Sequence, residues 1–308
     1  MPYDCIVLAK QVPDTKNITG QAMKDDGTVN RAALPAIFNP EDLNALEMAL
    51  SIRDRFGGKV TVITMGPPSA CEVLRDSLYR GADDVVLLTD RRFAAADTLA
   101  TSYALACAVK KIGKYDMIIC GSQAIDGDTA QVGPQTAEKL GLNQVTYVQN
   151  IREIADGAIT LERSVGGGYE VVKTRLPLLM TVTGTCNEPR PERAKRLLEY
   201  RRHTCAAEIA SRVAREMTTY GNPPPRDKVN EEAAPLIEAA EQTNRMLNVL
   251  DADGVEADAD MIGGSGSPTK VKKIESVVLA GGELVKIEPV EEDVRKLVKE
   301  LVKEHILA

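Results

Sequence analysis

Residues 59–88, KVTVITMGPPSACEVLRDSLYRGADDVVLL, decide the fold of this 308-residue chain. The β-branched run over residues 59–65 predicts a strand, which Gly66-Pro67-Pro68 breaks. The segment SACEVLRDSLYRG then predicts a helix that ends at Gly81, and residues 85–88 predict the next strand. A strand, a helix and another strand in this order are typical of a parallel β-α-β unit.

The same alternation continues on both sides of this unit. Upstream, residues 5–9 (CIVLA) form a short apolar run, and Asn39-Pro40 predicts a helix start with Asn39 as the N-cap. Downstream, Asp97 opens a helix, residues 117–120 (MIIC) predict a strand, and a last helix ends at Gly141. Short apolar strands separated by amphipathic helices predict an α/β fold, a doubly wound, mostly parallel sheet with flanking helices.

The composition argues against several classes of protein. A formal net charge of −7 argues against nucleic acid as a partner, and no apolar run approaches the roughly 18 residues that a membrane span needs. The first residues, Met1-Pro2-Tyr3-Asp4, do not resemble a basic leader, so we expect a cytoplasmic protein without a signal peptide. Six scattered cysteines and two histidines, none in a metal-ligand spacing, predict reduced thiols and no metal site.

Four segments follow the carboxyl ends of the predicted strands. They are residues 9–15, residues 64–68, the loop that leads to Asp97-Thr98, and residues 120–134 (CGSQAIDGDTAQVGP). In an open parallel sheet, ligands bind in the crevice outside these strand ends. The last segment is small, polar and broken by glycine, so it buries little and costs backbone entropy to order. We therefore expect a binding site where the four segments converge.

Two of these segments lead into predicted helices through an Asp-Thr pair. Asp97-Thr98 and Asp128-Thr129 are each expected at a helix start, where free N–H groups and the helix dipole favour an anion. Thr98 and Thr101 are three residues apart and share a helix face. The alternative is plain N-capping without a ligand. Because neither a Walker loop nor a GxGxxG motif is present, these residues predict a nucleotide cradle of another type.

The sequence shows no catalytic constellation, and no residue is assigned a catalytic role. Cys120 lies at a strand end, but no histidine is at hand to activate its thiol, and His203 is interpreted as a solvated surface residue. The carboxylates of Asp126 and Asp128 are an alternative metal site, which we disfavour. The sequence therefore predicts a binding function.

The second half of the chain changes character. Residues 146–185 alternate as β-structure, with a hairpin turn expected at Gly166-Gly167-Gly168. A basic segment extends to Arg202, and residues 206–220 and 228–250 are predicted to be helical. The remaining expectations are an acidic, flexible stretch at 251–266, a short strand at 277–280 and a charged helix at 291–307.

Several motifs together resemble the β subunit of electron transfer flavoproteins. The likeness covers residues 3–200 and 262–308 in family order, and the number of motifs makes it specific. The motifs are LAKQVPDT (8–15), FNPEDLNALEMAL (38–50), VTVITMGPP (60–68), GADDVVLLTD (81–90), ADTLATS (96–102), CGSQAIDGDTAQVGP (120–134), NEPR (187–190) and GSPTKV (266–271).

The resemblance implies an adenine-nucleotide-binding α/β fold and a heterodimer with an α subunit that carries FAD. The β subunit of this family binds either a structural AMP or a second FAD that bifurcates electrons from NADH. Thr15 stands where AMP-type members commonly have an aromatic residue, and ADTLATS and GDTAQVGP look like the bifurcating type. FAD is therefore favoured, with AMP as the alternative. The residues implied to hold the nucleotide are Ala9, Lys10, Asn39, Thr64, Met65, Gly66, Asp97, Thr98, Ala100, Thr101, Cys120, Gly121, Gln123, Ala124, Asp126, Gly127, Asp128, Thr129, Ala130, Gln131 and Val132.

The implied function is electron transfer between NADH or a flavin dehydrogenase and electron acceptors, by flavin-based bifurcation. One alternative is an AMP-binding, non-bifurcating β subunit of the same family. The other is a non-redox nucleotide-binding module, such as an adenine-nucleotide sensor. The flavin content of the assembled heterodimer separates these three functions.

The resemblance also divides the chain. Residues 1–205 are the expected nucleotide-binding domain, with a recognition loop for partner dehydrogenases at about 186–203, and residues 263–308 are an arm that packs on the α subunit. Residues 206–262 are expected to be an extra helical insertion with a further partner contact. Ala194 stands near the position of the family's leucine anchor, and Leu197 and Leu198 are its substitutes. The implied partner-binding residues are Asn187, Glu188, Pro189, Arg190, Ala194, Leu197 and Leu198.

Overall fold

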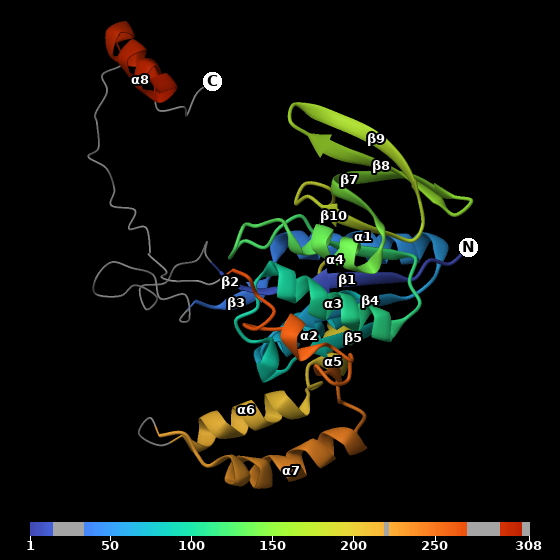
Figure 1. Ribbon diagram of the computed structural model, residues 1–308, viewed down its shortest axis with the longest axis vertical. Coiled ribbons are helices and arrows are strands. Elements are labelled where there is room, and N and C mark those ends of the chain that lie inside the picture. The colour runs from blue at the N-terminus through green and yellow to red at the C-terminus, as the bar shows by residue number, and fades with distance from the viewer. Residues whose placement is uncertain (15–33, 219–221, 270–289, 304–308) are drawn as a thin grey trace.

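A nine-stranded, mostly parallel sheet forms the centre of the computed structural model, which describes residues 1–14, 34–218, 222–269 and 290–303 (Figure 1). Two short strands, β2 (Gln11–Pro13) and β3 (Ala36–Phe38), form a separate antiparallel pair. The expected α/β fold class is confirmed. In spatial order the strands of the large sheet are β11 (Asn248–Leu250), β5 (Asp84–Leu88), β4 (Val60–Met65), β1 (Cys5–Ala9), β6 (Met117–Gly121), β10 (Leu178–Val182), β7 (Asn143–Ala155), β8 (Ala158–Val165) and β9 (Gly168–Arg175).

The central strands are apolar because both of their faces are covered. All five residues of β1 are buried, and they alternate between two hydrophobic cores on opposite sides of the sheet. Cys5 and Val7 belong to one core, whereas Ile6 and Leu8 belong to the other. A strand that is buried on both faces needs a continuous apolar run, which is how these strands were found in the sequence.

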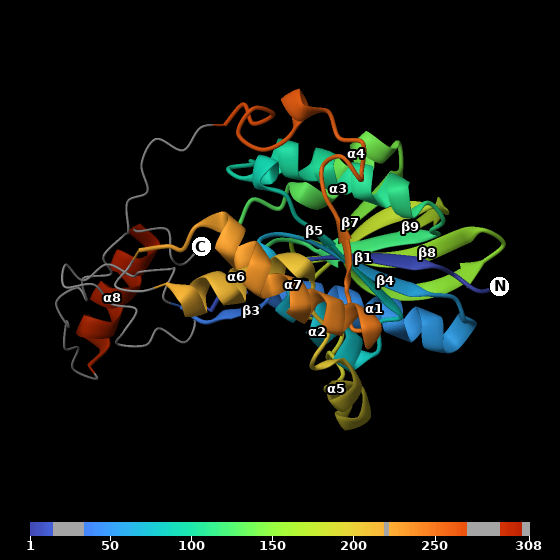
Figure 2. The same cartoon turned by 90° about the horizontal axis from the view of Figure 1, so that it is seen from below.

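Helices supply the cover on each face, and Figure 2 shows two pairs on opposite sides of the sheet. Helices α1 (Pro40–Phe56) and α2 (Cys71–Arg80) pack in the core that contains Cys5 and Val7. Helices α3 (Thr98–Ile112) and α4 (Val132–Leu140) pack in the core that contains Ile6 and Leu8. Short helical turns precede or follow them, namely η3 (Pro68–Ala70), η4 (Arg91–Phe93) and η5 (Ala259–Met261).

The order of the strands creates a switch point beside β1. The chain steps from β1 to β4 and then to β5 in one direction, and it returns to place β6 on the other side of β1. All of these strands are parallel, so their carboxyl ends lie at one edge of the sheet. In a doubly wound sheet this edge, where the strand order reverses, is the position of the ligand crevice.

The far side of the sheet ends in an antiparallel meander. Strand β7 pairs parallel to β10 and antiparallel to β8, and β8 pairs antiparallel to β9. The turn between β8 and β9 contains Gly167, whose φ of 86° lies in the left-handed region. The hairpin expected at the triple glycine is therefore confirmed.

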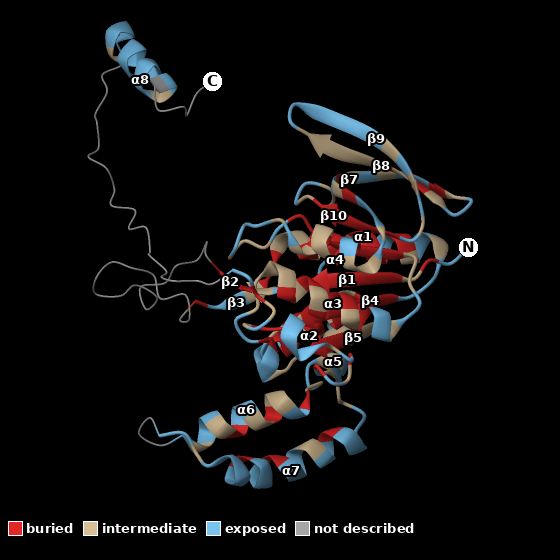
Figure 3. Cartoon of the chain, in the orientation of Figure 1, coloured by how far each residue is buried: buried red, intermediate tan, exposed pale blue. Residues whose placement is uncertain are grey.

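Helices α5 (Ala194–Tyr200), α6 (Ala206–Met217) and α7 (Arg226–Gln242) follow the sheet. Helices α6 and α7 form a hairpin below the body in Figure 1, with a small core of its own around Ile209, Val213 and Val229. Most of its outer surface is exposed (Figure 3). The last described helix, α8 (Glu291–Lys303), stands apart from the sheet in Figure 1. Thr15 and the strand expected at 277–280 lie outside the described residues.

Two expectations for the second half are wrong. The helix predicted over 228–250 ends at Gln242, and residues 248–250 are β11, which pairs parallel to β5. The stretch at 251–266 is not a loose segment, because Ala252, Val255 and Ile262 are buried in the core on the α3 side. Both elements are fixed by contacts with distant residues, which a local pattern does not contain.

Candidate functional site

A cavity of about 1670 Å³ opens at the switch point, outside the carboxyl ends of β1, β4 and β6. The four segments expected to converge all contribute to its lining. The predicted residues that line it are Ala9, Lys10, Met65, Gly66, Asp97, Thr98, Thr101, Cys120, Gly121, Gln123, Ala124, Asp126, Gly127, Asp128, Thr129, Ala130, Gln131 and Val132. The structure thus gathers them in one place, and nucleotide binding by them stays a prediction.

Three predicted residues, Asn39, Thr64 and Ala100, lie behind this lining. Thr64 is fully buried at the end of β4, and its hydroxyl has no hydrogen-bond partner in the described chain. Ala100 is buried within α3. Adjacent positions of a strand or helix face different sides, so these residues lie next to lining residues but face away from the cavity.

Asn39 holds the β6–α4 loop instead of capping α1. Its side-chain amide donates to the Gln123 carbonyl (3.0 Å), and its side-chain oxygen accepts from the Ile125 N–H (3.2 Å). Asn39 stands at the predicted N-cap position before Pro40, but its side chain makes no capping hydrogen bond to α1. In the first turn of α1, Glu41 accepts from the Ser122 hydroxyl and the Gln123 N–H. The start of α1 therefore fixes the shape of this loop.

Asp42 joins the ends of β1 and β6. Its carboxylate accepts from the Lys10 N–H (2.9 Å) and from the Gly121 N–H (2.9 Å). Burial raises the pKa of Asp42 to about 7, against the opposing effect of these hydrogen bonds. Gly121 leaves no room for a side chain, because a Cβ there would stand 2.7 Å from the Asp42 carboxylate oxygen. The backbone at Lys10 and Gly121 thus forms the floor of the cavity, and the buried carboxylate of Asp42 holds it in place.

The two expected helix starts differ in the structure. Asp97 caps α3 as predicted, since its carboxylate accepts from the N–H groups of Leu99 and Ala100 at 3.0 Å. Helix α4 begins only at Val132, and no side chain caps it at Gln131. Asp128 and Thr129 lie before the N-cap position, Gln131, and are too early in the chain to cap α4. The predicted cap is therefore wrong. The helix is short and starts late because the loop before it is bonded to α1.

The starts of α3 and α4 are nevertheless linked across the cavity. The Thr98 hydroxyl donates to the Gln131 side-chain oxygen (2.8 Å). Gly133, in the first turn of α4, packs so closely on the sheet that a Cβ would stand 2.8 Å from Thr181. Two helix N-termini therefore point toward one region lined by small residues, an arrangement that suits phosphate groups.

Cys120 and Asp126 have the surroundings of non-catalytic groups. Burial raises the pKa of the Cys120 thiol, so it stays protonated at neutral pH. The Asp126 carboxylate forms an ion pair with the Lys10 ammonium group (2.7 Å). Among the described residues, no cluster of three or more His, Cys, Asp or Glu side chains could hold a metal ion.

The sequence analysis missed part of the cavity. The missed segment is the hairpin, which was expected to meet a partner, whereas the loop around η4 belongs to the predicted segment that leads to Asp97-Thr98. A signal for the hairpin is present in α6, whose sequence AAEIASRVA has small residues at helical spacing. The lining residues that are not among the implied nucleotide-binding residues are Leu8, Asp42, Pro67, Pro68, Thr89, Asp90, Arg91, Phe93, Ala94, Ala95, Ala96, Leu105, Ser122, Gly133, Ala207, Ala210, Ser211, Ala214, Arg215, Thr218, Pro223, Pro224, Arg226, Val229, Asn230 and Thr269.

The expected recognition loop is attached to α1. Arg190 donates to both carboxylate oxygens of Glu47 (2.7 and 2.9 Å) and to Asp54 (2.8 Å). Hydrogen bonds keep the pKa values of both acids below their usual range despite burial, from Arg190 for Glu47 and from Arg53 and Arg190 for Asp54. Asn187 exchanges hydrogen bonds with Asn44. Glu188 and Pro189 lie between these anchors. Downstream in α5, Ala194 and Leu198 are exposed and Leu197 is half-buried.

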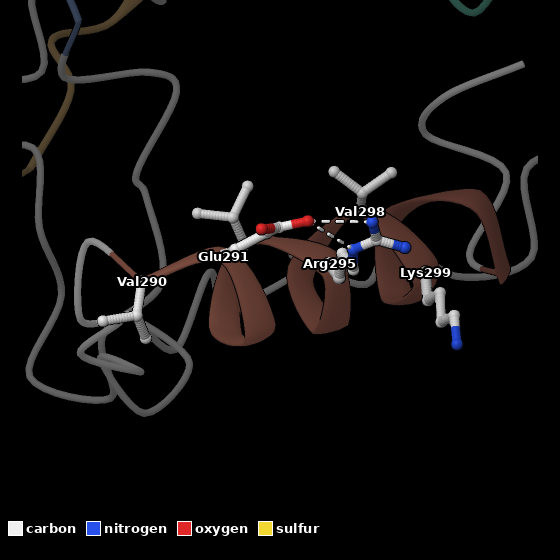
Figure 4. A pocket seen from close by; sticks show the side chains of 6 residues that line it. Val290, Glu291, Arg295, Val298 and Lys299 are labelled. Atoms are coloured by element: carbon white, nitrogen blue, oxygen red, sulfur yellow. Dashed lines mark hydrogen bonds and ion pairs between the residues drawn. The ribbon is translucent and has the colours of Figure 1, made fainter.

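A second hollow, of about 430 Å³, lies along α8 (Figure 4). Its lining is Val290, Glu291, Val294, Arg295, Val298 and Lys299, all from one stretch of chain. The Glu291–Arg295 ion pair crosses it at 2.8 Å. A hollow on one exposed helix encloses nothing, so we assign no ligand to it. No helix in the described part of the chain has the length and apolarity of a membrane span.

The fold and the cavity define a class: a doubly wound α/β protein with a nucleotide-type crevice at its switch point. The family model described as "Electron transfer flavoprotein domain" matches residues 26–208. The "Electron transfer flavoprotein subunit beta" of Clostridium acetobutylicum is 38% identical over 302 residues, which is 98% of this chain and 99% of that protein. The chain belongs to the electron transfer flavoprotein β-subunit family.

Other relatives match a shorter part of the chain at higher identity. "Protein FixA" of Bradyrhizobium diazoefficiens is 53% identical over 191 residues, 60% of this chain and 66% of that protein. The "Caffeyl-CoA reductase-Etf complex subunit CarD" of Acetobacterium woodii is 49% identical over 186 residues, 60% of this chain and 70% of that protein. The resemblance expected from the motifs is confirmed.

Proposed function

We propose that this chain holds FAD in the switch-point cavity and acts, with an α subunit, as an electron carrier. The observation that carries the proposal is the size of the cavity, about 1670 Å³. This volume exceeds the roughly 300–1,000 Å³ of a pocket for a drug-sized ligand. A mononucleotide such as AMP would leave much of this volume empty, whereas a dinucleotide would fill more of it.

The residues of the cavity fit such a ligand. Gly127 has open space where a Cβ would stand, so the ligand can approach its backbone, and the starts of α3 and α4 offer N–H groups to a pyrophosphate. The hydroxyls of Thr98 and Thr101 lie on the same wall. FAD, when bound, would supply the redox chemistry, since it exchanges electrons with donors and acceptors. The chain itself would bind, orient and shield it from water.

The proposal includes electron delivery from NADH or a flavin dehydrogenase to separate acceptors, by flavin-based bifurcation. Support comes from the ADTLATS and GDTAQVGP motifs, whose residues largely line the cavity. The exposed Leu198 and its neighbours Ala194 and Leu197 in α5 offer a surface for a dehydrogenase. The six free thiols suit a cytoplasmic location.

The decisive experiment identifies the nucleotides of the assembled protein. The chain is co-purified with its α subunit, the complex is denatured, and the released nucleotides are separated and quantified. We expect two FAD per heterodimer. One FAD together with one AMP would replace the proposal with the AMP-binding alternative. A correctly assembled heterodimer without flavin would favour the non-redox nucleotide-binding module.

A further inference from the structure

The α6–α7 hairpin forms a second wall of the cavity, opposite the helix starts. The lining side of α6 is built from Ala207, Ala210, Ser211, Ala214 and Arg215, which recur at helical spacing. Ile209 and Val213 lie on another side of α6 and pack against α7. Helix α6 therefore uses its apolar side to hold the hairpin together and its small-residue side to border the cavity.

The base of the hairpin is fixed to the nucleotide-binding fold. Arg75 of α2 donates to both carboxylate oxygens of Glu208 at 2.9 Å, and it also donates to the His203 carbonyl (2.9 Å). The side chains of Arg75 and Glu208 are only 15% and 20% exposed. The buried thiols of Cys71 and Cys205 lie 3.4 Å apart beside this pair. The position of the wall relative to the cavity is thus set by buried contacts.

Most ionic groups of the cavity already have a partner. Lys10 pairs with Asp126, Asp90 pairs with Arg92, and the carboxylates of Asp42 and Asp97 accept backbone N–H groups. Within the described ranges, the charged lining side chains for which no hydrogen bond or ion pair is formed are those of three arginines and one aspartate: Arg91, Arg215, Arg226 and Asp128. This surplus of unpaired cations favours an anion in the cavity.

The two hairpin arginines differ from an ordinary surface arginine on the same helix. Arg212 does not line the cavity, and its guanidinium group lies 4.0 Å from the Glu216 carboxylate one turn away. Arg215 and Arg226 line the cavity, and each side chain has no partner among the described residues. A guanidinium group binds phosphate oxygens in a bidentate way, which makes it the preferred side chain for this anion.

We propose that Arg215 and Arg226 bind phosphate oxygens of the nucleotide held at the strand ends. The hairpin then forms the wall of the nucleotide site that recognises the phosphate groups. This inference rests on the proposed nucleotide-binding function, and it adds two specificity-determining residues from a segment for which the sequence offered only a partner contact. It requires no change in the contacts of the strand-end loops.

The test compares ligands that differ only in their phosphates. The full-length chain is freed of bound nucleotide, and the affinities of ADP, AMP and adenosine are measured by calorimetry, with adenosine competed against ADP where needed. The variants are Arg215→Gln and Arg226→Gln, with Arg212→Gln as the matched control on the same helix. A charged hydrogen-bond pair lost in each variant corresponds to an affinity about tenfold or more weaker.

We expect Arg215→Gln and Arg226→Gln each to weaken ADP and AMP binding by this factor and to leave adenosine binding unchanged. Arg212→Gln should bind all three ligands as the parent does. ADP affinities equal to those of the control would overturn the inference and leave the nucleotide site intact. An equal loss for adenosine would also overturn it, because the hairpin would then act through shape. A parent chain that binds none of these three ligands and, in the same calorimetric assay, does not bind FAD would overturn the proposed function as well.

Discussion

At the scale of single residues, the floor of the cavity depends on positions that admit no side chain. Gly121 donates its N–H to the Asp42 carboxylate, and a Cβ added there would also stand 2.7 Å from the Glu41 Cβ. Such overpacking typically costs about 1–3 kcal/mol. We expect Gly121→Ala to lower the free energy of unfolding by this amount, measured by denaturant titration.

Gly127 provides the control for this substitution. It lies in the same loop and lines the same cavity, but a Cβ added there would have no atom within 4 Å. Gly127→Ala should therefore leave the free energy of unfolding nearly unchanged. Equal stabilities of the two variants would show that the Gly121 backbone can move away from α1, contrary to a rigid floor.

The buried acid Asp42 makes stability depend on pH. Its folded-state pKa is raised to about 7, whereas an unfolded aspartate titrates near 3.9. Between these values the folded chain holds a proton that the unfolded chain has lost. The resulting stabilisation is complete below the unfolded pKa and is lost as the pH rises through the folded pKa.

Asp42→Asn should remove this dependence. Between pH 5 and 7.5 we expect the parent chain to lose about 2 kcal/mol more unfolding free energy than the variant does. Asp128→Asn changes an exposed acid of the same cavity and should follow the parent. The measurement is denaturant titration at several pH values, and a variant curve parallel to the parent curve would refute the assignment.

The residues that line the site could be predicted where their position depended on strand order alone. Lys10, Gly66 and Cys120 follow apolar runs, so the rule that parallel strands end at one edge was enough to gather them. The role of Asn39 was not predictable, because its partners Gln123 and Ile125 lie 84 and 86 residues further along the chain. A local pattern suggested a cap, and the tertiary contacts gave the side chain another use.

At the scale of elements, one ion pair joins the hairpin to α2. Arg75 and Glu208 connect α2 to α6 with two hydrogen bonds, and hydrogen bonds between charged groups contribute about 1.5–3 kcal/mol. We expect Arg75→Gln to increase local opening of the hairpin by a free energy of this order. Hydrogen exchange of the amides of α6 and α7 measures it directly.

The comparison variant for this prediction is Arg212→Gln. Its ion pair with Glu216 is exposed and lies within α6, so it contributes little to the attachment of the hairpin. Exchange in α6 and α7 should then match that of the parent chain. If Arg75→Gln also exchanged like the parent, the hairpin would be held by its backbone pairing and not by the ion pair.

Element types were predictable where they were long and periodic, and failed where they were short. Strand β11 has three residues, two of them exposed, and it exists because β5 offers a free edge. The start of α4 was placed at Asp128-Thr129 because the pair resembles a cap, but the loop is held by Asn39 and Glu41 and the helix starts at Val132. The side of α6 that meets the cavity depends on how the hairpin docks, which its sequence does not encode locally.

At the scale of the whole molecule, α8 carries an apolar stripe without cover in the described chain. Val294 and Val298 are 47% and 45% exposed, and they are one turn apart on the same side. The arm was expected to pack on the α subunit, and we propose this stripe as the surface for that contact. Burying one valine contributes at least about 1.5 kcal/mol, which is about tenfold in affinity.

The prediction concerns assembly. We expect the double substitution Val294→Gln and Val298→Gln to weaken heterodimer formation by tenfold or more, measured by analytical ultracentrifugation. Glu300→Gln, on the same helix and exposed, should assemble as the parent does. Unchanged assembly of the valine variant would place the α-subunit contact elsewhere on the chain.

The ends of the α6–α7 hairpin lie side by side, because Thr204 and Met246 pair as a β-bridge. A segment that leaves and re-enters a fold at neighbouring residues can be gained or lost in one genetic event without moving a strand. The floor of the cavity and its second wall can therefore have separate evolutionary histories. Replacing residues 205–245 with the corresponding segment of another family member is then a practical way to alter ligand choice while preserving the fold.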